Sequence, residues 1–124
     1  MLAELCLAVA VYMEARGEPL AGQYAVAEVV MNRVESKRFP NDVCSVVSQK
    51  HQFSFLWDGK QFPGIRNKKA WERAETVARY TLRHKPQYTG ACHYTRKNIR
   101  RVWMKDLTRV AVIGNHKFMQ GGCN

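Results

Sequence analysis

The sequence predicts a single α+β domain, in which helices come first and a small antiparallel β-sheet comes late in the chain. Up to Arg83, apolar residues recur mostly at helical spacing, which is typical of helices that pack on a core. After Pro86 the pattern changes to short runs that favour strands. A length of 124 residues suffices for one hydrophobic core and not for two, so one domain is expected to span residues 1–124.

The first predicted helix is the most apolar part of the chain. Residues 5–13 read LCLAVAVYM, which is apolar on every face and therefore typical of a helix inside a protein. Pro19 suits the first position of the second helix, and Glu18 suits the positive end of its dipole. The predicted helices are residues 1–16, 19–35 and 68–83, with a short helical turn over 42–49.

The predicted strands are short. Residues 51–55 alternate polar and apolar side chains, as a half-buried strand does. Gly114 and Asn115 are turn residues that join the last two strands in a hairpin. The late strands that form the sheet are residues 91–95, 110–113 and 116–119.

The chain is strongly basic. Twenty Lys and Arg against ten Asp and Glu give a formal charge of +10, concentrated in the second half. Such a charge attracts nucleic acid, anionic membrane surfaces or anionic cell-wall polymers, or it serves solubility alone. No RNP-type motif, heptad repeat or Cys/His finger spacing is present. The sequence therefore favours an acidic polymer other than nucleic acid as the partner.

Four cysteines permit disulfides, although no CxxC pair occurs. Cys6 lies inside the apolar helix and is expected to be a free, buried thiol. The sequence leaves undecided whether Cys44 forms a disulfide with Cys92 or with Cys123.

Glu14 is the first charged residue after the apolar run, and Gly17 then ends the helix. The negative end of the helix dipole and the apolar neighbours both disfavour the ionised form, so they are expected to raise the pKa of Glu14. A carboxylic acid that keeps its proton near neutral pH is suited to general acid catalysis. The alternative is that Glu14 is merely the first exposed residue, paired with Arg16 or Arg33.

Other catalytic chemistries lack their motifs. The four histidines and four cysteines show no HExxH or similar pair, so no metal and no cofactor are expected. Ser54 lacks a GxSxG turn, and the glycines are too scattered to cradle phosphate. Several aromatic residues are of a kind that lines sugar grooves, although most aromatics belong to cores. They are Tyr12, Phe53, Trp57, Tyr94 and Trp103.

Three stretches carry a resemblance to a known family. MEARGEPLAGQYAVAEVVMNRV, then FPNDVCSVVSQKHQFSF, then HYT…W…LTRVAVIGNHKFM resemble the catalytic domain of the SleB/CwlJ-type cell wall hydrolases, known from spore-cortex lysis and from phages. The resemblance covers nearly the whole chain. It implies a small lysozyme-like α+β domain that acts on the glycan strand of peptidoglycan, with Glu14, the first Glu of the ExRGE-type motif, as the catalytic residue. Some members carry a cysteine directly before QFS that could pair with the counterpart of Cys44; this chain has His51 there.

The resemblance favours a lytic transglycosylase, which needs one carboxylate and forms a 1,6-anhydro ring on N-acetylmuramic acid. Hydrolysis by two carboxylates is the alternative, with Asp58 as the second acid and Glu28 another that could approach in space. An N-acetylmuramoyl-alanine amidase, which would normally need zinc, and a non-catalytic module that binds anionic polymer are further alternatives. The expected substrate-binding residues are Gln52, Phe53, Ser54, His93 and Tyr94, with Glu18 as a positioning residue.

The expected place of action is the cell wall, whether in the periplasm, the spore cortex or a host wall. No apolar stretch is long enough to cross a membrane. Glu4 stands where a signal peptide would carry positive charge, so the sequence suggests a phage lysin or a chain whose leader was removed. The expected partners are peptidoglycan glycan strands and anionic wall polymer, with no nucleic acid, and the domain is expected to be a monomer.

Overall fold

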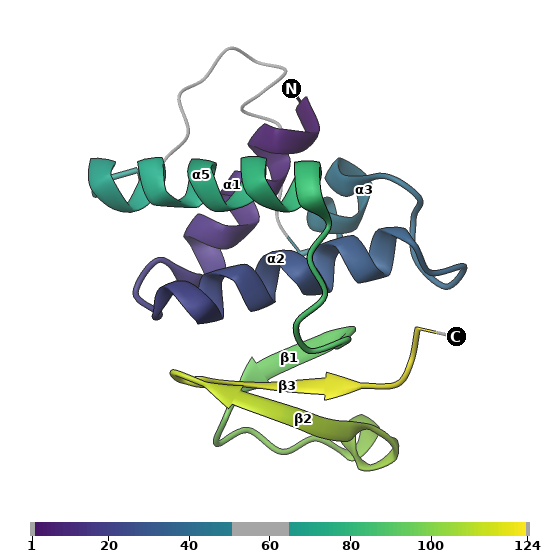
Figure 1. The fold of residues 1–124 in the computed structure, drawn as a ribbon. Helices are drawn as coiled ribbons and strands as arrows, with labels where there is room; N and C mark the ends of the chain where they lie inside the picture. Colours follow the sequence, from purple (N-terminus) through teal and green to yellow (C-terminus); the bar gives the residue numbers. More distant parts are fainter. Residues whose placement is uncertain (1, 51–64, 124) are drawn as a thin grey trace.

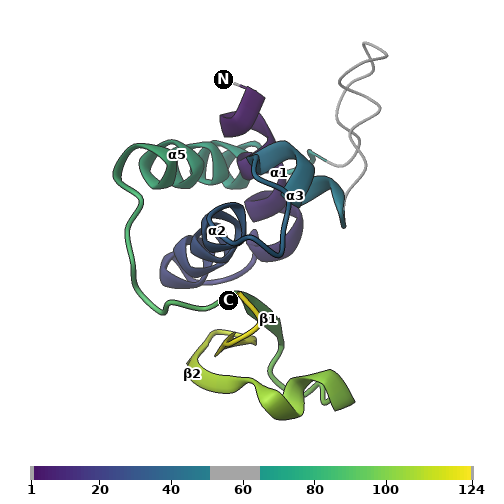
Figure 2. The same ribbon diagram turned by 90° about the vertical axis from the view of Figure 1, so that its right-hand side faces the viewer.

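The computed structural model describes residues 2–50 and 65–123. In this part of the chain four α-helices pack against one another, and a small sheet packs under them (Figure 1). The second helix lies between the other helices and the sheet, as the turned view makes clear (Figure 2). The elements are α1 (Leu2–Ala15), α2 (Leu20–Val34), α3 (Val43–Ser48), α5 (Lys68–His84), β1 (His93–Arg96), the 3-10 helix η1 (Val102–Asp106), β2 (Thr108–Ile113) and β3 (His116–Gln120).

The apolar helix α1 is the centre of the group of helices. It packs against α2, α3 and α5, and every residue from Cys6 to Tyr12 is buried. Burial on all sides is what an uninterrupted apolar run requires, because no face of such a helix can point to water without loss of hydrophobic free energy. The prediction of a core helix that ends near Glu14 is therefore confirmed.

The sheet has the strand order β1-β3-β2, and both strand pairs are antiparallel. Phe118 on the central strand is fully buried and packs on the α2 face formed by Ala25, Val26 and Val29. Tyr94 pairs with Phe118 across the sheet. Since paired residues share a face, Tyr94 also points toward the helices.

Both disulfides differ from the expectation. Cys6 is not a free thiol, because it is bonded to Cys44. The packing of α1 against α3 brings their Cα atoms to 5.2 Å, a separation that the spacing along the chain does not reveal. Cys92 is bonded to Cys123, with Cα atoms 6.0 Å apart, and this bond ties the start of β1 to the C-terminal segment.

The predicted helices and late strands agree with the structure to within about two residues at each end, which is the usual uncertainty of helix boundaries. The η1 helix was not predicted. The expected strand over 51–55 lies outside the described residues. Within the described part of the chain, no helix is long and apolar enough to cross a membrane.

Candidate active site

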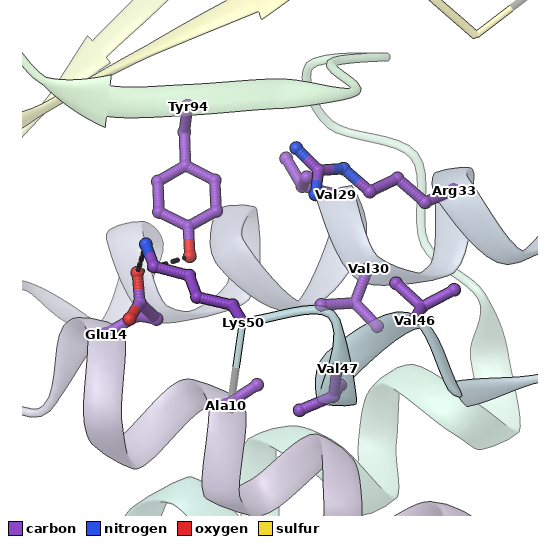
Figure 3. Close-up of a pocket in the computed structure, with 9 residues that line it drawn as sticks. All are labelled: Ala10, Glu14, Val29, Val30, Arg33, Val46, Val47, Lys50 and Tyr94. Atoms are coloured by element: carbon purple, nitrogen blue, oxygen red, sulfur yellow. Dashed lines mark hydrogen bonds and ion pairs between the residues drawn. The ribbon is translucent and has the colours of Figure 1, made fainter. Parts of the chain in front are cut away.

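Glu14 lies on the last turn of α1, where its side chain is 15% exposed. Its Oε1 atom accepts a hydrogen bond from the Tyr94 hydroxyl at 2.8 Å and lies 2.7 Å from the Lys50 ammonium (Figure 3). The three residues come from α1, from the segment after α3 and from β1. The fold therefore gathers groups that are 36 and 80 positions away from Glu14 in the sequence.

Tyr94 is held in place by its aromatic neighbours. Its ring centroid lies 5.8 Å from that of Phe118 and 5.3 Å from that of His116. Burial, together with the nearby charge of Glu14 and the hydrogen bond to it, raises the pKa of Tyr94 far above its usual value. The hydroxyl therefore stays protonated at all working pH values and acts as a permanent donor to the carboxylate.

Lys50 is the site residue that the sequence did not indicate. Its side chain is 67% exposed, so solvent screens its ion pair with Glu14. Neither alternative partner makes that contact: Arg16 donates to the carbonyl of Tyr12, and Arg33 donates to the carbonyl of Cys92. Nothing in the polar stretch around Lys50 signals the contact, because it depends on where α3 ends in space.

The Glu14 carboxylate lies where an apolar pocket meets a polar groove. The pocket is lined by small aliphatic side chains, with Lys50, Tyr94 and Arg33 also at its wall (Figure 3). The groove consists of two adjoining hollows of about 340 and 290 Å³ that share Met13, Glu14, Arg96 and His116. The aliphatic residues of the pocket are Ala10, Val29, Val30, Val46 and Val47.

Glu18 lines the same groove and is fixed to the β2–β3 hairpin. Its carboxylate accepts bonds from the backbone N–H of Asn115 at 2.7 Å and from the Asn115 side chain at 3.1 Å, and it lies 3.5 Å from His116 Nδ1. Burial acts to raise the pKa of Glu18, but the bonds from Asn115 and the charge of His116 outweigh it, and the pKa is lowered. Gly114 has a φ of +58°, and a Cβ atom there would lie 2.5 Å from the Glu18 carboxylate. These contacts suit Glu18 to a positioning role.

Glu28 does not approach Glu14 as a second acid. It is fully buried, and its carboxylate accepts bonds from the backbone N–H groups of residues 88–90 and from the Thr89 hydroxyl. Its contacts hold the segment that leads into β1. Asp58, the other acid considered, lies outside the described residues.

The remaining predicted site residues do not all gather at Glu14. His93 does not line the hollows around Glu14, and it instead contacts Arg33 and the ring of Trp103. Tyr12 is buried in the core against Trp71. Gln52, Phe53, Ser54 and Trp57 lie outside the described residues. No cluster of His, Cys, Asp and Glu that could hold a metal occurs within residues 2–50 and 65–123.

The fold and the site together define a small lysozyme-like α+β domain with a glutamate at the end of its buried helix, facing a groove. The profile of the Cell Wall Hydrolase family matches residues 17–119, and the chain belongs to this family. The matched range begins just after Glu14.

Two solved structures of SleB catalytic domains are similar to this chain over nearly its whole length. The catalytic domain of the germination-specific lytic transglycosylase SleB from Bacillus anthracis is 31% identical and superposes with a TM-score of 0.73, over 95% of this chain and 93% of that one. The catalytic domain of the Bacillus cereus SleB protein is 32% identical with a TM-score of 0.68, over 97% and 91%. These similarities confirm the expected fold and the resemblance to SleB-type domains.

Among curated proteins, the spore cortex-lytic enzymes of Bacillus subtilis strain 168 and of Bacillus cereus are each 50% identical to this chain over 54 residues. The match covers 44% of this chain, and 18% and 21% of those proteins. The chain thus matches only about a fifth of the length of these relatives.

Proposed function

We propose that this domain cleaves the bond between N-acetylmuramic acid and N-acetylglucosamine in peptidoglycan as a lytic transglycosylase, with Glu14 as the catalytic acid and base. The supporting observation is the position of Glu14, which faces the groove and is oriented by Tyr94. Among the described residues that line the groove, Glu18 is the only other acid, and its oxygens are bound to Asn115. Membership of the Cell Wall Hydrolase family and the likeness to SleB support the same reaction.

In this mechanism Glu14 first donates its proton to the glycosidic oxygen, and the bond from that oxygen to C1 of N-acetylmuramic acid breaks. The carboxylate then removes the proton of the C6 hydroxyl of the same sugar, whose oxygen attacks C1. A 1,6-anhydro ring forms, no water is consumed, and Glu14 recovers its proton. Tyr94 keeps the carboxyl group in one orientation through both transfers.

Lys50 has to leave Glu14 before the first transfer. An adjacent ammonium favours the ionised carboxylate, whereas the acid step needs a proton on it. Because Lys50 is exposed, its side chain can rotate away as a glycan strand enters the groove. Its departure removes the charge that favours the ionised carboxylate, so that Glu14 can carry the proton which the first step requires.

The test is a Glu14→Gln variant incubated with purified sacculi, with Glu4→Gln as the matched control. Glu4 lies on the same helix, paired with Arg79 and away from the groove. We expect Glu14→Gln to lose about two to four orders of magnitude in rate and Glu4→Gln to remain active. A Glu14→Gln variant with near-wild-type activity would refute both the residue and the mechanism.

Hydrolysis is a second candidate, because Glu18 lines the same groove as Glu14. Mass spectrometry of the released muropeptides separates the two reactions. Transglycosylase products end in 1,6-anhydro-muramic acid and are lighter by one water, and these are the products expected. Reducing N-acetylmuramic acid ends would establish hydrolysis instead.

The basic surface supports anionic wall polymer as a partner of the same domain. Arg96 and Lys50 stand beside the groove, so their charge attracts the carboxylates of peptidoglycan stem peptides toward Glu14. The proposed place of action is accordingly the cell wall, with residues 1–124 acting as one catalytic domain.

A further inference from the structure

An exposed tip, residues 100–105, consists of the residue pair before η1 and all of η1 except its last residue, Asp106, and the proposed reaction does not use it. The tip lies at the end of the molecule that faces away from the helices (Figure 2). Val102 is 81% exposed and Trp103 is 51% exposed, although both are apolar. The three basic residues of the tip, Arg100, Arg101 and Lys105, are exposed as well.

The tip has a defined structure. The Lys117 ammonium donates to the carbonyl of Ile99 at 2.6 Å and so anchors the tip to the central strand. The ring of Trp103 lies 5.6 Å from that of His93. In a 3-10 helix residues three apart share a face, so Val102 and Lys105 point the same way. The exposure of the apolar residues is therefore built into the fold.

The surroundings of the tip are almost uniformly cationic. Residues 96–109 contain six Lys and Arg and a single acidic residue, Asp106. A projecting apolar apex among cations is the composition of segments that lie at a lipid–water interface, where the apolar side chains enter the acyl boundary and the cations meet anionic headgroups. Trp is favoured at that depth because its ring is apolar and its N–H is polar.

We propose that the 100–105 tip binds the surface of an anionic lipid bilayer. The shape of the tip argues against a glycan strand as its occupant, because ligand sites are concave, as the Glu14 groove is, whereas the tip is exposed and Trp103 lies outside that groove. The tip is also separate from that groove, since none of its residues lines the hollows around Glu14. Such a contact would hold the domain at the boundary between membrane and wall.

The experiment is co-sedimentation of the full chain with vesicles of phosphatidylcholine and phosphatidylglycerol in equal parts, and with vesicles of phosphatidylcholine alone. Val102→Asp tests the apolar apex, and because Val102 is highly exposed we expect the variant to fold normally. Leu20→Asp is the matched control, because Leu20 is also apolar and 51% exposed, lies at the start of α2, and gives the same charge change. We expect Val102→Asp to weaken binding to anionic vesicles by at least about tenfold, and Leu20→Asp to weaken it far less.

The cations are tested in the same way. Neutralising Arg100, Arg101 and Lys105 with glutamine should weaken vesicle binding by about fivefold for each charge. Neutralising three exposed cations of α5 controls for net charge; these are Lys68, Lys69 and Arg73. Equal losses in the two triple variants, equal binding to both vesicle types, or loss of sacculus binding without loss of vesicle binding would each overturn the proposal.

Discussion

Replacing Tyr94 by Phe tests whether the hydrogen bond to Glu14 matters for the reaction. The substitution removes only the hydroxyl, so the ring contacts with Phe118 and His116 are kept. A hydrogen bond to a charged group contributes about 1.5–3 kcal/mol. The bond is 2.8 Å long and joins a hydroxyl to a carboxylate, so a value within this range is expected.

If the bond orients Glu14 in the transition state, its loss should lower kcat by about tenfold to a hundredfold, since each 1.36 kcal/mol is a factor of ten in rate. The assay is the initial rate of turbidity loss of purified sacculi. Tyr88→Phe is the matched control, because Tyr88 is exposed and lies outside the hollows around Glu14.

A double-mutant cycle separates this effect from a general loss of stability. Unfolding in urea of Tyr94→Phe, Glu14→Ala and the double variant should give a coupling of about 1.5–3 kcal/mol between the two residues. A coupling below about 0.5 kcal/mol together with wild-type kcat in Tyr94→Phe would refute the reasoning.

Three further outcomes are expected. Binding of the chain to sacculi should weaken steeply as salt is raised toward 1 M, where the Debye length falls to about 3 Å, and salt-independent binding would show that the charge has another use. Glu28→Ala should lower the free energy of unfolding in urea by more than about 3 kcal/mol, because it removes a fully buried carboxylate that accepts from the backbone N–H groups of residues 88–90. Glu72→Ala on the exposed face of α5 should change it by less than about 0.5 kcal/mol. Burial lowers the pKa of His93 and of His116 in the folded protein, so below the ordinary histidine pKa of 6.5 the unfolded chain binds more protons than the folded one. The Tm should therefore fall as the pH falls through that value. A Tm that rises instead would contradict the burial of these histidines.

Local patterns were sufficient for most elements of the fold. The periodicity of apolar residues reports which face of a segment is buried, and it located α1, α2 and α5 because each buries a large, regular surface. It missed η1, because none of the residues of that short helix is buried and so it leaves no periodic signal.

The sequence by itself also determined that Glu14 lies at the end of a helix in the core, since a run that is apolar on every face has to be buried and Glu14 is the first charged residue after it. Only the tertiary structure decided what surrounds that carboxylate. The contacts with Lys50 and Tyr94 join three elements that are distant in the chain, and the pairing of Cys6 with Cys44 depends on how α1 packs against α3. The physical reason is that a sequence pattern indicates which residues of one segment are buried and which are exposed. Which two segments come into contact depends on how their buried faces pack together in three dimensions.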